Sequence, residues 1–253
     1  MDLKNHHVIV TGAASGLGAA TAHAFSAAGA RVTLFDRDER QGAAVARDID
    51  GAFVSVDVTS EPDVERAVAA AQQQSGSIHA LVQCAGIGWA RKILGKRGPH
   101  SLEEFEQVLR INLLGTFNVA RWTAHAMRDN PAEPSGERGV IINTTSIAAY
   151  EGQIGQVAYA ASKGGVASMT LPLARELAQY GIRVAAIAPG IFATPMLGIL
   201  PETTRDAIAA QIPFPRRLGH PEEYAALARH IVENAMINGA VIRLDGAVRL
   251  GPQ

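Results

Sequence analysis

Short runs of β-branched residues alternate with longer alanine-rich stretches along most of the chain, and this alternation restricts the fold more than any other feature. A strand, an amphipathic helix and a second strand make a βαβ unit, and such units build a parallel sheet covered by helices. The pattern therefore predicts an α/β fold with a doubly wound parallel sheet of seven strands and helices on both faces. The predicted strands are His7–Thr11, Arg31–Asp36, Ala52–Val56, Ala80–Cys84, Val140–Thr144, Arg183–Ala188 and Val241–Leu244. The predicted helices are Ser15–Ala28, Glu39–Asp48, Pro62–Gln74, Leu102–Met127, Gln156–Tyr180 and Pro221–Val232.

Two segments interrupt this alternation, and no linker or repeat divides the 253 residues. We therefore expect one domain over residues 1–253, with an inserted loop at 87–100 and a substrate lid at 189–217. Long loops inside a compact α/β domain are usually lids or binding loops. The loop carries a group of positive charges, Arg91, Lys92, Lys96 and Arg97. The lid carries an apolar set that could face a hydrocarbon ligand, Ile191, Met196, Leu197, Ile199, Leu200 and Phe214.

Charge and cysteine content exclude several classes of protein. The 23 lysine and arginine residues balance 24 aspartate and glutamate residues, which argues against a nucleic-acid partner. The one cysteine, Cys84, allows no internal disulfide and favours a reducing compartment. The histidines show no metal-ligand spacing, and no apolar run approaches the ~18 residues of a membrane span. We expect a soluble intracellular protein that binds neither a membrane nor a metal.

A glycine-rich turn joins the first predicted strand to the first predicted helix. It contains Gly12, Gly16 and Gly18, together with Ser15 and Leu17. Glycine lets the backbone approach a pyrophosphate closely, and the helix N-terminus adds free N–H groups and partial positive charge. Strand, turn and helix in this order are typical of a Rossmann-type dinucleotide site.

An acidic residue at the end of the second strand indicates which dinucleotide binds. Asp36 is placed to accept hydrogen bonds from the adenosine ribose and to repel a 2′-phosphate, which favours NAD over NADP. Arg37 could instead accommodate that phosphate, or it is a solvated surface arginine. After the third strand, Asp57 and Val58 are placed to meet the adenine, although Asp57 could equally cap the following helix.

Three polar residues in the middle of the chain form a candidate catalytic group. Tyr159 and Lys163 lie four residues apart in a predicted helix and so share one face. A tyrosine titrates near pH ~10 and needs a nearby positive charge to act as a base near neutrality. Ser146 follows the fifth predicted strand, at the sheet edge where such folds bind ligands.

Taken together, these motifs resemble the short-chain dehydrogenase/reductase family over essentially the whole chain. The resemblance rests on Thr11–Gly18, Cys84-Ala85-Gly86, Asn112, Ser146, Tyr159–Lys163 and Pro189-Gly190. It implies that Tyr159 is the general acid and base, that Lys163 lowers its pKa and holds the nicotinamide ribose, and that Ser146 binds the substrate oxygen. It also implies that Asn112 holds a water molecule of a proton relay. The remaining residues implied to bind the cofactor are Cys84, Ala85, Gly86, Pro189, Gly190, Ile191 and Thr194, the last contacting the carboxamide.

Two adjacent positions depart from the family pattern. The usual Asn-Asn-Ala-Gly after the fourth strand is Gln83-Cys84-Ala85-Gly86 here. In the family these asparagines stabilise the sheet, so the substitution puts the local hydrogen bonding in question and leaves the chemistry untouched. Cys84 itself is interpreted as a small apolar filler at a buried strand end rather than a redox thiol.

Within the family, the chain is most similar to the type 2 3-hydroxyacyl-CoA dehydrogenases, also described as 17β-hydroxysteroid dehydrogenases type 10. The shared segments include Glu151-Gly152-Gln153, Met169–Pro172, Pro213-Phe214-Pro215 and Ile242–Ala247. This resemblance implies NAD as cofactor, a homotetramer, an inserted loop after the fourth strand, and substrate contacts from Gln153 and Gln156. We expect a cytoplasmic location, or a mitochondrial one if the source is an animal.

The predicted reaction is reversible oxidation of a short or branched 3-hydroxyacyl-CoA to the 3-oxoacyl-CoA. The basic loop would suit the phosphates of coenzyme A, or it is only a solvated surface loop. A secondary-alcohol or hydroxysteroid dehydrogenase of the same family also fits Asp36, whereas a ketoacyl-carrier-protein reductase would prefer NADPH. A non-catalytic NAD-binding protein is the alternative from another class, and the presence of Ser146, Tyr159, Lys163 and Asn112 argues against it.

Overall fold

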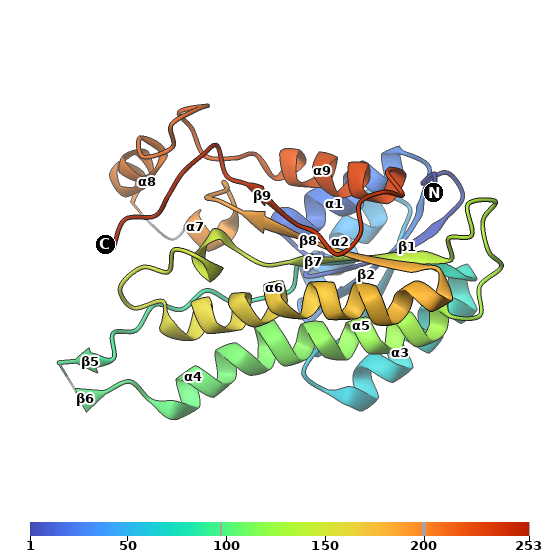
Figure 1. Ribbon diagram of the computed structural model, residues 1–253, viewed down its shortest axis with the longest axis horizontal. Helices are drawn as coiled ribbons and strands as arrows, with labels where there is room; N and C mark the ends of the chain where they lie inside the picture. The colour runs from blue at the N-terminus through green and yellow to red at the C-terminus, as the bar shows by residue number, and fades with distance from the viewer. Residues whose placement is uncertain (97, 199–200, 253) are drawn as a thin grey trace.

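A twisted parallel sheet lies at the centre of the structure (Figure 1), a computed structural model that describes residues 1–96, 98–198 and 201–252. Among these residues the sheet has seven strands in the order β3-β2-β1-β4-β7-β8-β9, and every pairing is parallel. This confirms the predicted doubly wound α/β fold. The strands are β1 (His7–Thr11), β2 (Arg31–Asp36), β3 (Ala52–Ser55), β4 (Ile78–Gln83), β7 (Gly139–Thr144), β8 (Ile182–Pro189) and β9 (Val241–Leu244).

Helices cover both faces of this sheet. One apolar cluster joins helices α1, α2 and α9 to strand residues such as Val8 and Val10, and the second joins α3, α5 and α6 to the intervening Ile9. This alternation follows from the two-residue period of a strand, which sends successive side chains to opposite faces. The helices are α1 (Gly16–Ala27), α2 (Glu39–Asp48), α3 (Glu61–Ser75), α4 (Leu102–Leu109), α5 (Thr116–Met127), α6 (Val157–Leu177), α7 (Pro195–Gly198), α8 (Glu202–Ala209) and α9 (Pro221–Glu233). None of the helices in the described part of the chain is long and apolar enough to span a membrane.

The predicted helix Leu102–Met127 is interrupted by a π-helical segment, η1 (Arg110–Gly115), between α4 and α5. Gly115 packs so closely on Val58 that an added Cβ would lie 2.6 Å from its Cγ2. Within the same segment Asn112 is fully buried and hydrogen-bonded through its side chain. The wider turn accommodates these contacts, and amphipathic periodicity alone does not distinguish a π segment from an α-helix.

The two predicted loops contain short elements of their own. The segment after β4 contains a small antiparallel hairpin, β5 (Leu94–Gly95) and β6 (Gly98–Pro99), which projects from the body of the molecule in Figure 1. The segment after β8 contains α7 and α8. Two 3-10 turns, η2 (Ile147–Ala149) and η3 (Ala178–Tyr180), flank α6. Arg97, Ile199 and Leu200, named in the sequence analysis, lie outside the described residues, as does the side chain of Met196.

At the amino-terminal end of the sheet, a buried arginine ties several elements together. Arg183 on β8 donates to Glu137 at 2.6 Å, and both side chains are buried. Its remaining N–H groups donate to the carbonyl oxygens of Ile231, Val232 and Ile237, at the end of α9 and beyond it. Charged residues are buried in this way only when they are paired, and here the guanidinium is paired on all sides.

Candidate active site

A cavity of about 950 Å³ opens at the carboxyl ends of the strands, where the strand order reverses between β1 and β4. Ligands bind at this position in open α/β sheets. Nearly all residues singled out in the sequence line this one cavity, although they are spread over most of the chain. They are Gly12, Ser15, Gly16, Leu17, Gly18, Asp36, Asp57, Val58, Cys84, Ala85, Gly86, Ser146, Gln153, Gln156, Tyr159, Lys163, Pro189, Gly190, Ile191 and Thr194.

The glycine turn has the shape that a pyrophosphate requires. Gly12 has a φ of 64° and lies so near the strand β4 end that an added Cβ would be 2.6 Å from the Ala85 nitrogen. A Cβ on Gly18 would run into the carbonyl oxygen of Gly12. Glycine at these two positions therefore lets the turn pack directly on the end of β4 and on the start of α1, which begins at Gly16. A dinucleotide fits this cradle because its phosphates can reach the free N–H groups of the helix N-terminus.

Asp36 lies at the end of β2 and its carboxylate is fixed by the backbone. One oxygen accepts from the Ala14 N–H at 2.9 Å and the other from the Asp38 N–H at 3.0 Å. Each oxygen keeps a further lone pair for a ribose hydroxyl. Arg37 points its Nε to within 4.0 Å of Asp57. Asp57 does not cap α3, since Ser60 does so, and instead accepts from the N–H and hydroxyl of Thr59.

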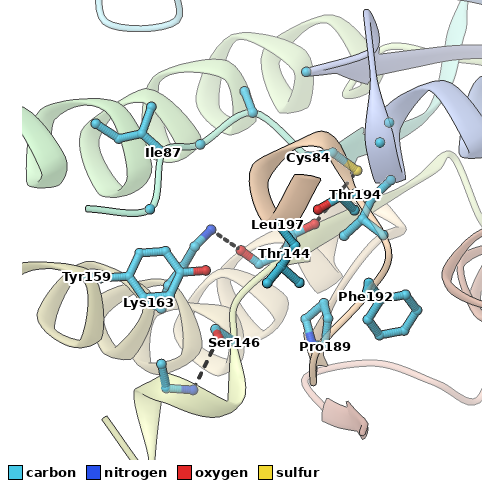
Figure 2. A pocket seen from close by; sticks show the side chains of 18 of the residues that line it. Cys84, Ile87, Thr144, Ser146, Tyr159, Lys163, Pro189, Phe192, Thr194 and Leu197 are labelled. Carbon is cyan, nitrogen blue, oxygen red and sulfur yellow. Dashed lines mark hydrogen bonds between the residues drawn. The ribbon is translucent and has the colours of Figure 1, made fainter. Parts of the chain in front are cut away.

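Tyr159 and Lys163 project from α6 into the cavity, and Ser146 faces them from the segment after β7 (Figure 2). The Lys163 ammonium is buried and donates to the carbonyl oxygen of Thr144 at 2.8 Å. Its Nζ lies 6.0 Å from the centre of the Tyr159 ring. The Ser146 hydroxyl oxygen accepts from the Ala148 N–H at 3.1 Å, which leaves its own proton available to a ligand.

Burial dominates the electrostatics of this group. It lowers the pKa of Lys163 to about 8, because the charged ammonium loses its hydration. It also raises the pKa of the Tyr159 hydroxyl, and the neighbouring Ser146 lowers that pKa only in part. In the protein alone, burial of the Tyr159 hydroxyl outweighs the hydrogen bond from Ser146, and the Lys163 ammonium is turned toward Thr144. The lowering of the Tyr159 pKa by Lys163 together with a bound cofactor stays a prediction. A phenolate at Tyr159 needs further positive charge in the cavity.

Cys84 behaves as the predicted filler. Burial raises the pKa of its thiol, which disfavours the reactive thiolate. Its sulfur lies 3.7 Å from the Tyr224 hydroxyl and 3.8 Å from that of Thr144, and these two hydroxyls are hydrogen-bonded to each other at 2.6 Å. Within the described ranges, no three side chains of the histidine, cysteine, aspartate or glutamate type are grouped to hold a metal ion.

Asn112 is the one predicted site residue that does not line the cavity. Its amide accepts from the Ile87 N–H at 2.8 Å and donates to the Ile87 carbonyl at 2.9 Å and to the Ser162 hydroxyl at 3.1 Å. These three bonds occupy the side chain and fix the start of the loop after β4. The structure therefore gives the Asn112 side chain a role in positioning Ile87, which does line the cavity.

The start of the basic loop, from Ile87 to Ala90, lines the cavity, but its described basic side chains do not. Arg91 pairs with Glu104 at 3.3 Å, and neither Lys92 nor Lys96 lines the cavity. Arg91 instead borders a smaller hollow of about 280 Å³, together with Gly88, Trp89, Ala90 and Glu104. Only some of the apolar lid residues that were expected to face a ligand line the cavity. Ile191 and Leu197 line the cavity, whereas Phe214 is 82% exposed, and its backbone N–H donates to the Gly246 carbonyl at 3.4 Å.

Several lining residues were not anticipated from the sequence. Trp89 stands at the rim, Ile208 and Gln211 come from the lid, and Leu250 comes from the C-terminal segment. Thr144 supplies the carbonyl that holds Lys163. Composition and spacing carry no signal for these residues, because their position depends on how the lid and the chain end fold back over the sheet.

The geometry and the comparisons with known proteins agree. A family model described as short chain dehydrogenase matches residues 6–205, and the chain belongs to that family. The chain is thus an oxidoreductase that uses a nicotinamide cofactor, and the cavity is its candidate active site. Human 3-hydroxyacyl-CoA dehydrogenase type-2 is 52% identical to this chain over 254 residues, which cover 99% of this chain and 97% of the human protein.

Two solved structures extend the similarity. The 3-hydroxyacyl-CoA dehydrogenase type-2 from Mycobacterium avium is 41% identical, with a TM-score of 0.94 and coverage of 100% of both chains. The 3-ketoacyl-(acyl-carrier-protein) reductase from Brucella melitensis, complexed with NADH, is 32% identical, with a TM-score of 0.88. The similarity covers 98% of this chain and 100% of the reductase chain.

Proposed function

We propose that this protein is an NAD-dependent dehydrogenase that oxidises the 3-hydroxyl group of a short or branched 3-hydroxyacyl-CoA, and that catalyses the reverse reduction. The observation that carries this proposal is the meeting of Ser146, Tyr159 and Lys163 in one cavity beside a bare glycine turn. The choice of substrate is supported by the 52% identity to a relative named for that reaction.

In the direction of oxidation, the hydroxyl O–H and the adjacent C–H bond of the substrate both break. Tyr159 takes the proton on its phenolate oxygen, and Ser146 donates a hydrogen bond to the oxygen that becomes the ketone. The nicotinamide, when bound, accepts the hydride and adds positive charge to the cavity. The Lys163 ammonium, which donates to the Thr144 carbonyl, would favour the phenolate form of Tyr159 together with the positive charge of the bound cofactor.

Asp36 supports NAD rather than NADP as the cofactor. Its carboxylate is fixed by the Ala14 and Asp38 N–H groups, and a 2′-phosphate placed there would meet this negative charge. Arg37, which could have balanced that phosphate, lies beside Asp57 instead. Gly12, Gly16 and Gly18 would hold the pyrophosphate, and Thr194 would contact the carboxamide.

A secondary-alcohol or hydroxysteroid dehydrogenase is the second candidate, and one observation favours it. The substrate side of the cavity is lined by Trp89, Leu197, Ile208 and Leu250, whereas Arg91, Lys92 and Lys96 lie away from it. An apolar alcohol without a coenzyme A group would fit this lining as well. Gln153 and Gln156 are the polar residues proposed to orient either substrate.

The proposed assembly is a homotetramer. Large apolar side chains of the η1, α5 and α6 segments face solvent in the single chain: Leu114 is 56% exposed, Phe117 47% and Leu171 44%. Exposed apolar side chains grouped on helices are typical of subunit interfaces. Light scattering on the purified protein tests this, and a monomer mass would contradict it. A cytoplasmic location, or a mitochondrial one in an animal, stays a prediction.

The experiment that tests the proposed function compares three substrates by initial rates of NAD reduction. These are 3-hydroxybutyryl-CoA, free 3-hydroxybutyrate and 2-butanol, each assayed with NAD and with NADP. We expect kcat/KM to be at least about 100-fold higher for the CoA ester, because contacts with the remote part of the substrate contribute to the transition state. Equal or higher values for the free alcohols would replace the proposed function with the second candidate.

A further inference from the structure

The chain end returns to the active site after β9. The segment from Asp245 to Pro252, here called the tail, runs from the end of β9 toward the part of the molecule that carries α7 and α8 (Figure 1). Leu250 in this tail lines the cavity beside residues of the lid. The proposed chemistry does not use the tail.

Glu151, just after η2, anchors the tail. Its carboxylate accepts two hydrogen bonds from the Arg243 guanidinium, at 2.9 and 3.0 Å. The Arg249 guanidinium lies 3.3 Å away, and the Leu250 N–H donates to the same carboxylate at 3.4 Å. A bidentate guanidinium–carboxylate pair fixes direction as well as distance. The backbone on either side of Leu250 is therefore held to the segment that carries the candidate active-site residues.

Two further contacts hold the tail farther along. The Gln153 side chain donates to the carbonyl oxygen of Gly251 at 3.3 Å, and the Ile154 N–H donates to that of Pro252 at 3.0 Å. The tail therefore lies alongside residues 151–154 over several consecutive positions. Since Gln153 lines the cavity, the tail also helps to place a side chain proposed to touch the substrate.

A small apolar cluster, separate from the two large ones, joins the tail to the lid. Its buried members are Ile147, Ile212 and Val248, and Leu218 and Leu250 pack against them. Ile147 follows Ser146 directly, and Ile212 belongs to the lid. The Leu250 side chain is thus supported from behind by side chains of the site and of the lid. A supported apolar side chain makes a firm wall, because buried side chains pack closely and move little.

We propose that Leu250 is a specificity-determining residue that closes the substrate cavity and limits the length of the carbon chain that it accepts. Glu151 acts as a positioning residue, since it holds the backbone of Leu250 in place. The inference rests on the proposed function only for the identity of the carbon chain, an acyl group of a CoA ester. The Leu250 side chain would contact any apolar substrate that fills the cavity.

The test is a chain-length series, with kcat/KM measured for 3-hydroxyacyl-CoA esters of four, six, eight and ten carbons. We compare the wild type with Leu250→Ala, Leu250→Phe and the control Leu102→Ala, whose leucine is 69% exposed at the start of α4. Each methylene newly buried is worth about a fourfold gain in kcat/KM. Leu250→Ala should raise the ratio of long-chain to four-carbon kcat/KM by about tenfold, and Leu250→Phe should lower it by a similar factor.

Glu151→Gln tests the positioning role. This variant keeps the size of the side chain but weakens the pairing with Arg243 and Arg249. We expect a shift toward longer chains of the same sign as in Leu250→Ala, with the affinity for NADH unchanged within about threefold. NADH fluorescence and thermal unfolding identify any variant that fails to fold, and in that case Leu250→Val gives a milder reduction in size.

A second substrate series, of simple alcohols, tests the role of Leu250 independently of the proposed CoA substrate. The same variants are assayed with 2-butanol, 2-hexanol, 2-octanol and 2-decanol. If the wild type does not prefer CoA esters, the proposed substrate is wrong, and the alcohol series still measures the effect of Leu250. The decisive quantity is the ratio of kcat/KM for the long substrates to that for the short ones. If this ratio changes by less than about twofold in the folded Leu250 variants with both substrate series, Leu250 does not limit the chain length and the inference is overturned.

Discussion

Gln83 on β4 donates through its Nε2 to the Oδ1 of Asn143 on β7, at 2.9 Å, and the two residues are direct partners in the register of the parallel pair. Both side chains are buried, at 3% and 0% exposure. Gln83 is one of the two positions where the chain departs from the asparagines that the family resemblance leads one to expect. The longer glutamine still reaches the neighbouring strand, so the link between β4 and β7 is kept.

Gln83→Ala should destabilise the protein by about 1–3 kcal/mol, because the Asn143 oxygen would stay buried without its donor. The Asn143 Nδ2 already lacks a hydrogen-bond partner in the described residues, so the side chain has no second contact to compensate. Chemical denaturation measures the change in the free energy of unfolding. Gln73→Ala, at an exposed position on α3, is the matched control. Equal stability of the two variants would show that the Gln83–Asn143 bond contributes nothing measurable.

Tyr159→Phe removes the hydroxyl that is proposed to exchange a proton with the substrate and leaves the ring in place. We expect kcat to fall by about a thousandfold or more, in the upper range for loss of a general acid or base. The affinity for NADH should change by less than about threefold, as measured by fluorescence titration. Tyr180→Phe, at the surface after α6, serves as the control. A Tyr159→Phe enzyme with near-normal kcat would rule out the proposed chemistry.

Asp36→Asn tests the basis of cofactor choice. The substitution removes the negative charge that would repel a 2′-phosphate and weakens the hydrogen bonds to the ribose. Hydrogen bonds to charged groups are worth about 1.5–3 kcal/mol, so the ratio of kcat/KM for NAD to that for NADP should fall by about 10- to 100-fold. Initial rates with both cofactors give this ratio. Asp48→Asn, on the exposed end of α2, should leave it unchanged. A wild-type enzyme that prefers NADP would contradict the assignment before any variant is made.

His79 on β4 makes the stability depend on pH. Burial and the neighbouring His6 ring lower its pKa to about 4, from an ordinary value of 6.5. Between these two pH values the unfolded chain binds a proton that the folded chain does not, so stability falls as the pH falls through this window. The side chain is only partly buried and solvent screens its charge, which leaves about 1 kcal/mol of the effect.

Thermal unfolding of the wild type at pH 7.5, 6.0 and 5.0 measures this dependence, and His79→Gln should flatten it. His7, whose pKa burial also lowers, accounts for part of the slope that remains. His125→Gln, at an exposed position on α5, should keep the wild-type slope. If the stability of His79→Gln depends on pH as steeply as that of the wild type, groups other than His79 cause the loss of stability at low pH.

Much of the fold followed from local pattern. The bounds of β1, β2, β9 and α2 agree with the prediction, because strand alternation and helix ends have local signals such as the cap at Asp38. The cofactor side of the cavity was also predictable, since the glycine turn, Asp36 and the Tyr159–Lys163 spacing each carry their own chemistry.

The substrate side was not predictable in the same way. Leu250 and Gln211 reach the cavity only because the tail and the lid fold over the sheet, a long-range arrangement without a local sequence signal. The electrostatics of the site depend on packing in the same way. The burial that raises the Tyr159 pKa and the direction of Lys163 toward Thr144 have no local sequence signal. The role of the basic loop toward coenzyme A stays a prediction, and the pairing of Arg91 with Glu104 is a contact between segments without a local sequence signal.

The buried guanidinium of Arg183 divides the domain into a rigid end and a compliant end. It fixes β8 to the last turn of α9 and to Ile237 at the side of the sheet opposite the lid. We therefore expect any opening that lets substrate in to occur at the other end of the sheet, around α7 and α8. Backbone amides should therefore exchange with solvent deuterium along a gradient, slowest near Arg183 and fastest in the lid. Catalytic turnover can proceed through such local opening while the sheet beneath the cofactor keeps its shape.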